Sequence, residues 1–183
     1  MRKVVVYQLL SLDGVAEEPG NWMFDVDEAV FDNLARVIEP QVAVLMGRLT
    51  YDYWVDYWPG SDVEPFASFI NGTTKHVLTS RGLSQPWENS VVVDKPLVEY
   101  VRALKQQIHG DVGVHGSISV AQALLRAGLV DELRLVVAPT LAHRGRRLFD
   151  HQEALRRLEL QSSDRTPTGN LLLTYRVGSD SKR

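Results

Sequence analysis

Residues 112–139 read VGVHGSISVAQALLRAGLVDELRLVVAP, and this stretch indicates the class of fold. Residues 112–115 are a short apolar run typical of a buried strand, residues 119–127 have helical spacing, and residues 133–138 form a second apolar run. Gly128 directly follows the helical segment, where glycine commonly ends a helix. A strand, a helix and a strand in this order predict part of a parallel sheet covered by helices.

Similar segments continue on both sides of this unit. Further strands are expected at residues 4–10, 42–46, 75–79 and 90–93, and further helices at residues 27–38, 48–57, 66–71 and 96–108. Asp25 or Asp27 is the expected cap of the first helix, and Pro40 follows its end. Residues 158–162 and 170–177 come last, as the two arms of a hairpin-like pair. The pattern predicts an α/β fold whose mixed, mostly parallel sheet is flanked by helices and has an antiparallel C-terminal edge.

The chain has the features of one domain. Its 183 residues, of which 44% are hydrophobic and 23% charged, are enough for a sizeable core. No low-complexity linker, internal repeat or block of like charge divides the sequence. We expect a single domain over residues 1–177 and a short disordered tail over residues 178–183.

The composition excludes several classes of function. The chain has no cysteine, which excludes thiol catalysis, disulfides and cysteine-ligated metal sites. Its net charge of -3 gives no bulk basicity for a nucleic-acid partner. No apolar run approaches the roughly 20 residues of a membrane span, and the start MRKVVVYQLL lacks a secretory cleavage site. We therefore expect a cytoplasmic protein without a membrane or nucleic-acid partner.

The charges are distributed unevenly along the chain. Residues 1–75 contain 12 acidic and 5 basic residues, whereas residues 76–183 contain 11 acidic and 15 basic residues. Two interpretations stay open. The imbalance is either a chance property of a solvated surface or a sign that the later arginines bind an anionic ligand.

Two predicted strands end in glycine directly before a helical segment, in VLMGRLT at residues 44–50 and VGVHGS at residues 112–117. In a parallel sheet, ligands bind beyond the carboxyl ends of the strands, and the free N–H groups of a following helix suit phosphate. Arg48 adds a cation, while Thr50 and Ser117 add hydroxyl donors. Tight strand-to-helix turns are the simpler explanation at either glycine alone.

A third strand end favours a dinucleotide ligand. Residues 75–81 read KHVLTSR, so that Ser80 and Arg81 follow the predicted strand. A guanidinium beside hydroxyls suits a ribose 2′-phosphate, because it donates two hydrogen bonds to phosphate oxygens. An exposed arginine in a turn is the alternative, and the GxGxxG fingerprint of the usual dinucleotide-binding fold is absent.

Other kinds of site have little support. The five histidines lack the spacing of metal ligands, so no metal site is expected. No GxSxG motif indicates a serine hydrolase. Trp54, Tyr57 and Trp58 form an aromatic group whose expected role is core packing, with a wall for a planar substrate as the alternative.

In their order and spacing, the motifs resemble the dihydrofolate-reductase-like superfamily, and more closely the group related to the reductase domain of riboflavin biosynthesis. The matching segments are SLDG (11–14), Trp22, MGRLTY (46–51), YWP (57–59), KHVLTSR (75–81), VHGS (114–117), GLVDELRLVVAP (128–139) and GRRLF (145–149). The resemblance covers about residues 2–177. It implies a dihydrofolate-reductase-like sheet with NADPH lying across its strand ends.

The resemblance also assigns residues to the cofactor. The implied contacts with the pyrophosphate region come from Gly47, Arg48 and Thr50, and those with the 2′-phosphate side come from Thr79, Ser80 and Arg81. Gly116, Ser117 and Ile118 would approach the pyrophosphate and the nicotinamide half. By the same resemblance, the SLDG loop covers the nicotinamide and Asp13 borders the active site. Asp13 is the candidate catalytic residue for supplying a proton, directly or through a water molecule. For that role its pKa would have to rise by burial.

The substrate half follows from the same resemblance. The implied substrate-binding residues are Trp22, Tyr51, Trp54, His143 and Arg144. His143 and Arg144 take positions that are often small in relatives, which would make the pocket narrower or more cationic. Arg146 and Arg147 lie in the same implied substrate loop.

The implied activity is that of an NADPH-dependent oxidoreductase, similar to 5-amino-6-(5-phosphoribosylamino)uracil reductase or to dihydrofolate reductase. Its substrate would be a small heterocycle that is pterin- or pyrimidine-like, and homodimers are common among such proteins. Two alternatives stay open. One is an NADP(H)-binding module without efficient catalysis, and the other is a structural homodimer in which the glycines only form turns.

Overall fold

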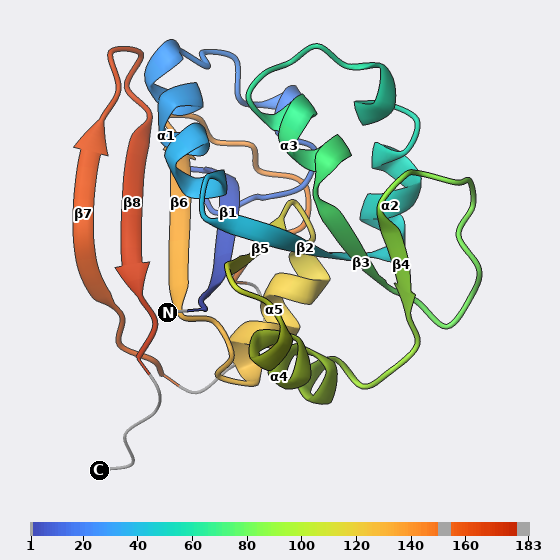
Figure 1. The fold of residues 1–183 in the computed structure, drawn as a ribbon. Helices are drawn as coiled ribbons and strands as arrows, with labels where there is room; N and C mark the ends of the chain where they lie inside the picture. The colour runs from blue at the N-terminus through green and yellow to red at the C-terminus, as the bar shows by residue number, and fades with distance from the viewer. Residues whose placement is uncertain (1, 150–154, 179–183) are drawn as a thin grey trace.

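An eight-stranded sheet forms the centre of the molecule, with the strand order β4-β3-β2-β5-β1-β6-β8-β7 (Figure 1). The structure is a computed structural model that describes residues 2–149 and 155–178. Its strands are β1 (Val4–Ser11), β2 (Gln41–Gly47), β3 (Thr74–Leu78), β4 (Ser90–Val93), β5 (Asp111–His115), β6 (Glu132–Ala138), β7 (Glu159–Arg165) and β8 (Leu171–Arg176). Strands β1 to β6 pair in parallel, whereas β8 runs antiparallel to β6 and β7. This confirms the predicted mixed sheet and its antiparallel C-terminal edge.

The described residues also form five α-helices and two short 3-10 helices. They are α1 (Glu28–Ile38), α2 (Arg48–Trp54), α3 (Phe66–Gly72), α4 (Leu97–Gln107) and α5 (Ile118–Arg126), with η1 (Pro19–Asn21) and η2 (Trp58–Gly60). Asp27 is the cap of α1, because its carboxylate accepts a hydrogen bond from the N–H of Val30 at 3.3 Å. Helix α2 ends at Trp54, before the expected residue 57, and the chain continues in a turn in which the N–H of Tyr57 donates to the carbonyl oxygen of Trp54 at 3.1 Å. Residues 179–183 of the expected tail lie outside the described residues.

The helices cover the two faces of the sheet (Figure 1). Alternate residues of β1 point to opposite faces, so Val6 joins the core cluster under α4 and α5, whereas Val5 joins the cluster under α1. A third cluster, around Val44 of β2, packs against α2 and α3. Strands β1, β2, β3, β5 and β6 run parallel, so their carboxyl ends lie along one edge of the sheet.

A close approach of side chains requires a glycine in the middle of β5. A Cβ added at Gly113 would lie 1.9 Å from Oε1 of Gln41 and 2.7 Å from Nε2 of His115. The Gln41 amide passes over this glycine, and its Oε1 lies 2.8 Å from Nε2 of His115. Gly113 therefore provides the space in which these two buried side chains form a hydrogen bond.

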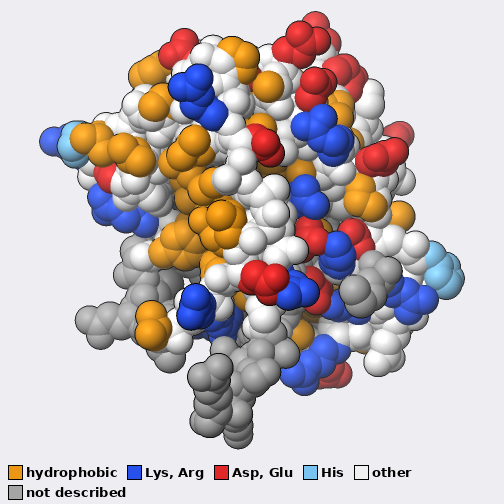
Figure 2. Space-filling model, turned by 90° about the vertical axis from the view of Figure 1, so that its left-hand side faces the viewer, with side chains coloured by type: hydrophobic (Ala, Val, Ile, Leu, Met, Phe, Trp, Pro, Cys, Tyr) orange, Lys and Arg blue, Asp and Glu red, His pale blue; other side chains and the backbone are white. Residues whose placement is uncertain are grey.

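Strand β7 forms one free edge of the sheet. Every residue of β7 is exposed, and Leu160 keeps 52% of its surface accessible. Figure 2, which views the molecule from this side, shows hydrophobic side chains gathered beside the edge.

Within residues 2–149 and 155–178, no helix has the length and apolar character needed to span a membrane.

Candidate active site

Three neighbouring strands bring the predicted cofactor residues to the same edge of the sheet. In the sheet, β2 lies between β3 and β5, and all three run parallel. Each carboxyl end leads directly into predicted residues, at 47–50, 79–81 and 116–118. The structure therefore places side by side three segments that are far apart in the sequence.

Hydroxyl groups join two of these strand ends. The N–H of Gly47 donates to Oγ of Ser117 at 2.8 Å, and Oγ1 of Thr50 lies 2.7 Å from the same oxygen. Gly47 ends β2 and Ser117 directly precedes α5, so these bonds set the spacing between the β2–α2 and β5–α5 turns. The predicted residues at these turns form one connected group.

Position 116 requires a glycine because of its backbone conformation and because the Trp54 ring lies close to it. Its φ of 65° lies in the left-handed region, and a Cβ there would lie 3.0 Å from Cζ2 of Trp54. The Trp54 ring also makes an edge-on contact with Phe66, with 5.5 Å between the ring centroids. The end of β5 is thus a bare backbone beside an aromatic surface.

The third strand end is a tight turn that presents a cation. Oγ1 of Thr79 accepts a hydrogen bond from the N–H of Arg81 at 3.1 Å. The Thr79 hydroxyl also donates to the carbonyl oxygen of Arg81 at 3.2 Å. The side chains of Ser80 and Arg81 are exposed, and no described residue pairs with the Arg81 guanidinium. Thr79 therefore shapes the turn and leaves Arg81 available to a ligand.

Arg48 differs from Arg81 because it already has partners. Its Nε lies 2.8 and 2.7 Å from the two carboxylate oxygens of Asp52, and its Nη1 donates to the carbonyl oxygen of Gly82. The carboxylate offsets part of the positive charge that the sequence suggested for this position. Arg48 fixes the loop after β3 to helix α2, next to the predicted cofactor edge.

Asp13 fastens the loops that follow β1 and β6. Its carboxylate accepts hydrogen bonds from the Ser11 hydroxyl at 2.7 Å and from the N–H groups of Ala142 and His143 at 2.9 and 3.0 Å. The Arg147 guanidinium lies 3.3 Å from this carboxylate and donates to the Asp13 carbonyl oxygen at 2.9 Å. We call these five residues the Asp13 clasp.

The clasp lowers the pKa of Asp13, whereas the role of proton donor would require a raised one. The hydrogen bond from Ser11, together with those from Ala142 and His143, holds the pKa of Asp13 well below its usual range, although partial burial acts in the opposite direction. The condition for direct proton donation, a pKa raised by burial, is therefore not met in this structure. An ionised carboxylate does not donate a proton near neutral pH, so these hydrogen bonds disfavour direct donation by Asp13, and its catalytic role stays a prediction.

The predicted substrate residues have different surroundings. Tyr51 has no exposed surface, and its hydroxyl donates to the carbonyl oxygen of Gln85 at 2.8 Å, while its contact with the substrate stays a prediction. Trp22 is also buried and packs in the same cluster as Tyr7 of β1. Its contact with the substrate likewise stays a prediction. His143 is exposed and has a positive φ of 60°.

Several contacts around this site had no clear sequence signal. Glu17 accepts a hydrogen bond from the N–H of Arg146 at 3.0 Å, and the Arg146 guanidinium donates to Oγ of Ser119 in α5 at 2.8 Å. These bonds connect the clasp loops to helix α5, which begins beside the strand ends where the cofactor is predicted to bind. Only Ser11 had a detectable signal, because a serine two residues before Asp13 is typical of a side-chain-stabilised turn.

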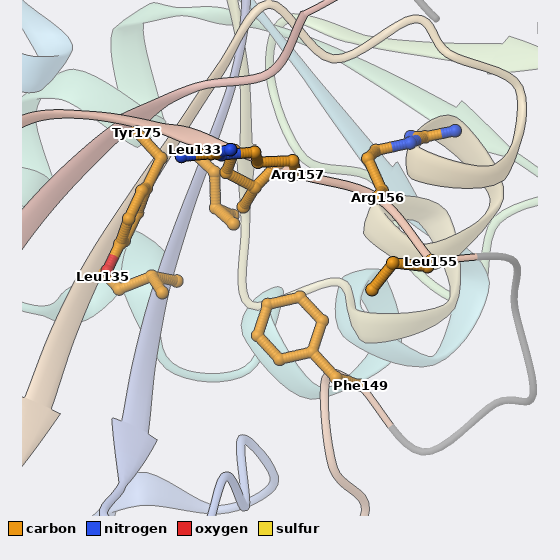
Figure 3. Close-up of a pocket in the computed structure, with 8 residues that line it drawn as sticks. Leu133, Leu135, Phe149, Leu155, Arg156, Arg157 and Tyr175 are labelled. Atoms are coloured by element: carbon orange, nitrogen blue, oxygen red, sulfur yellow. The ribbon is translucent and has the colours of Figure 1, made fainter.

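Two grooves among the described residues lie away from these strand ends. An apolar groove of about 580 Å³ lies on the β6–β8 part of the sheet, and Figure 3 shows Phe149 between Leu135 and Leu155 there. A polar groove of about 470 Å³ includes Lys3 and Asp111, near the amino ends of the parallel strands. Neither groove contains a residue that the sequence predicted for the cofactor or the substrate.

The clasp makes a testable prediction for Asp13→Asn. The amide would turn an N–H group towards backbone donors, so hydrogen exchange at Ala142 and His143 should accelerate about tenfold. In the wild type, a lowered folded pKa gives stability that is present above the unfolded pKa of about 3.9 and is lost as the pH falls through the folded value. Protection of these amides should therefore persist to about pH 4.

Exchange followed residue by residue by NMR would measure this effect. Asp32→Asn, at an exposed position of α1, is the matched control and should leave both amides protected. Equal exchange in wild type and Asp13→Asn would contradict the clasp.

The sequence is similar to a known protein family over nearly its whole length. The family model of the RibD C-terminal domain matches residues 2–172. The uncharacterized protein YyaP of Bacillus subtilis strain 168 is 25% identical over 154 residues, which cover 81% of this chain and 80% of that protein.

Solved structures share the fold at low sequence identity. A candidate riboflavin biosynthesis protein from Shewanella sp. PV-4 has a TM-score of 0.80 and 20% identity, and the match covers 96% of this chain and 99% of that one. Dihydrofolate reductase from Enterococcus faecalis, complexed with NADP(H) and RAB-propyl, has a TM-score of 0.64 and 16% identity, with 95% of each chain covered. The fold is dihydrofolate-reductase-like, and the match to nearly the whole sequence shows that the chain belongs to the RibD C-terminal domain family.

Proposed function

We propose that this protein is an NADPH-dependent reductase that transfers a hydride to a small heterocyclic substrate, pterin- or pyrimidine-like. The observation that carries the proposal is the convergence of the β3, β2 and β5 ends, with their cation, hydroxyl groups and glycine backbone, at one edge of the sheet. Membership of the RibD C-terminal domain family and the similarity to a dihydrofolate reductase complexed with NADP(H) support it.

The residues at this edge fit the proposed cofactor. The exposed Arg81 guanidinium has no partner among the described residues and can bind the 2′-phosphate together with Ser80 and Thr79. The turns at 47–50 and 116–118 can approach the pyrophosphate, because glycine leaves the backbone bare at both. When bound, NADPH supplies the hydride, and the chain's residues orient it and exclude water.

The substrate side follows from the position of the clasp. The loops it joins follow β1 and β6, and β1 lies between β5 and β6 in the sheet. Trp54 lies at the boundary between the two sides, since its ring meets Gly116. His143 and Arg144 are exposed in the clasp loop and stay our predictions for polar contacts with the substrate.

Thermal-shift titration followed by a turnover assay tests the proposal. A ligand at 100 times its dissociation constant should stabilise the folded state by about 2.7 kcal/mol. We expect stabilisation by NADPH, and oxidation of NADPH when a dihydropterin or an aminopyrimidine substrate is added. No stabilisation by NADPH, NADP or NADH would refute the proposal.

Arg81→Ala tests the assignment of the 2′-phosphate. A charge-assisted hydrogen bond to phosphate is worth roughly 1.5–3 kcal/mol, so the dissociation constant for NADPH should rise about 10- to 100-fold. The constant for NADH should change little, because NADH lacks the phosphate. Isothermal titration with both cofactors would measure this, with Arg102→Ala on the exposed surface of α4 as the control. Equal losses for NADPH and NADH would exclude the assignment.

A second candidate is an NADP(H)-binding module without efficient catalysis. The observation that favours it is the Asp13 clasp, which engages the residue that the sequence offered as a proton donor. This candidate predicts thermal stabilisation by NADPH without turnover of any pterin, pyrimidine or carbonyl compound. The turnover assay therefore separates the two candidate functions. For both functions we propose a homodimer, which sedimentation of the free protein would test.

A further inference from the structure

Two buried polar atoms next to the candidate active site lack hydrogen-bond partners. They are Oη of Tyr7 and Nδ1 of His115, and no described residue bonds to either atom. Tyr7 is 5% exposed and His115 is 3% exposed. The two residues are direct neighbours across β1 and β5, with 5.7 Å between their ring centroids. Because buried polar groups are almost always paired, two unpaired atoms on neighbouring residues indicate a missing polar partner.

The hydrogen bonds of Gln41 fix which nitrogen of His115 carries the hydrogen. Nε2 of Gln41 donates to the carbonyl oxygen of Val37 at 3.0 Å, which leaves Oε1 facing Nε2 of His115 at 2.8 Å. A carbonyl oxygen only accepts, so Nε2 of His115 must be the donor. Burial lowers the pKa of His115 to about 3, and the ring is therefore neutral at neutral pH. Its free Nδ1 is a hydrogen-bond acceptor.

Tyr7 supplies a hydrogen-bond donor beside the acceptor of His115. Burial raises the pKa of the Tyr7 phenol above its ordinary value, so the hydroxyl keeps its hydrogen and can donate it. The pair thus offers one acceptor and one donor on adjacent strands. An adjacent ring N–H and carbonyl group, the lactam edge found in pterins and pyrimidines, has the complementary pattern.

The surroundings suit a flat, mostly apolar ligand. Tyr7 packs in the same cluster as Trp22, and the His115 ring contacts Phe66 with 5.2 Å between centroids. Gly116, the next residue after His115, belongs to the cofactor edge. Both orphan atoms are inaccessible to solvent, so a ligand reaches them only after a side chain on this face moves. Trp54 is half-buried and contacts both Gly116 and Phe66, which makes it the side chain we expect to move.

We propose that Tyr7 and His115 recognise the lactam edge of the heterocyclic substrate, with Nδ1 of His115 accepting from a ring N–H and the Tyr7 hydroxyl donating to the neighbouring carbonyl oxygen. The inference rests on the proposed reductase function and names residues that determine its substrate specificity. The competing occupant is one buried water molecule that bonds to both atoms.

Nitrogen NMR of protein labelled in its histidines tests the contact directly. The probes are 5,6-diaminouracil, which has a ring N–H beside a carbonyl, and 5,6-diamino-1,3-dimethyluracil, in which both ring nitrogens are methylated. We expect an unprotonated Nδ1 in the free protein and a shift of its resonance with the first probe only. A protonated Nδ1 in the free protein, an unchanged Nδ1 with the first probe bound, or no binding of that probe at millimolar concentration would each overturn the proposal.

Two tyrosine variants form a matched pair for the second test. Tyr7→Phe removes an unpaired hydroxyl, whereas Tyr100→Phe removes one that lies 2.7 Å from Nδ1 of His76. Tyr7→Phe should weaken binding of 5,6-diaminouracil about tenfold without lowering the melting temperature. Tyr100→Phe should lower the melting temperature and leave the affinity unchanged. Unchanged affinity in Tyr7→Phe overturns the proposal, as does a water on both atoms that remains when the probe is bound.

The experiment separates this inference from the proposed function. The probes are titrated with and without NADP, so the NMR result does not depend on turnover. If the wild type binds and oxidises NADPH while Tyr7→Phe keeps its affinity for the probe, only the recognition pair fails. If NADPH does not bind, the proposed function fails by its own titration.

Discussion

Gly113→Ala is expected to lower the free energy of unfolding by about 3 kcal/mol, because it combines overpacking with the loss of buried hydrogen bonds. The new Cβ would lie 1.9 Å from Oε1 of Gln41. Gln41 can move away only by giving up its bonds to Val37 and His115, all within the buried interior. Denaturant unfolding would measure the loss, and the melting temperature should fall by about 6–12 °C.

Gly72→Ala is the control for this change. A Cβ at Gly72 meets nothing within 4 Å, so its effect should stay within about 0.5 kcal/mol. Gln41→Ala removes the main obstacle, and in that background Gly113→Ala should cost less than it does alone. Equal stability of the Gly113→Ala and Gly72→Ala proteins would show that Gln41 does not pass over β5 as described.

Gly116→Val is expected to have the largest effect on cofactor binding. A β-branched residue is strained at a φ of 65°, and its Cβ would lie 3.0 Å from the Trp54 ring. The strain and the crowding together should lower the free energy of unfolding by about 3 kcal/mol. Because the side chain also projects where the backbone should approach the cofactor, the NADPH affinity should fall at least about a hundredfold.

Gly128→Val separates the two contributions. Gly128 has a φ of 64°, nearly that of Gly116, but a Cβ there meets nothing within 4 Å. This variant should show the backbone strain alone, about 1–2 kcal/mol, and unchanged affinity for NADPH. Isothermal titration and denaturant unfolding of both variants provide the comparison. Normal NADPH affinity in Gly116→Val would remove the end of β5 from the proposed cofactor site.

Most strands and helices could be predicted from the sequence, because they have a local signal. Apolar runs mark strands β1 to β6, helical spacing marks the helices, Pro96 precedes the start of α4 and Gly128 follows the end of α5. Strand β7 is polar and exposed over most of its length and extends beyond the predicted residue 162, and the two 3-10 helices were not predicted. The order of the strands had no such signal. The insertion of β1 between β5 and β6 depends on pairing over more than a hundred residues, which a local pattern does not contain.

The sequence identified the residues at the strand ends of the candidate site. It did not reveal the hydrogen bonds that set the protonation states of the side chains there. Glycine before a helix and a basic turn identified the residues at 47, 81 and 116, because those features are local. The state of Asp13 depends on the nearby Ser11 hydroxyl and also on the N–H groups at 142 and 143, and the second set of partners cannot be found without the fold. The same limit applies to His115, whose bond to Gln41 spans two strands, and to Lys75, a fully buried cation held by the carbonyl oxygen of Ile70.

The Asp13 clasp also bears on when the site can form during synthesis on the ribosome. Asp13 emerges early, but its partner Ala142 follows 129 positions later. Until that stretch leaves the exit tunnel, the nascent chain lacks the two backbone N–H donors that hold the Asp13 carboxylate. A chain that stops translation before residue 142 would therefore leave the loop after β1 without its partners in the loop after β6.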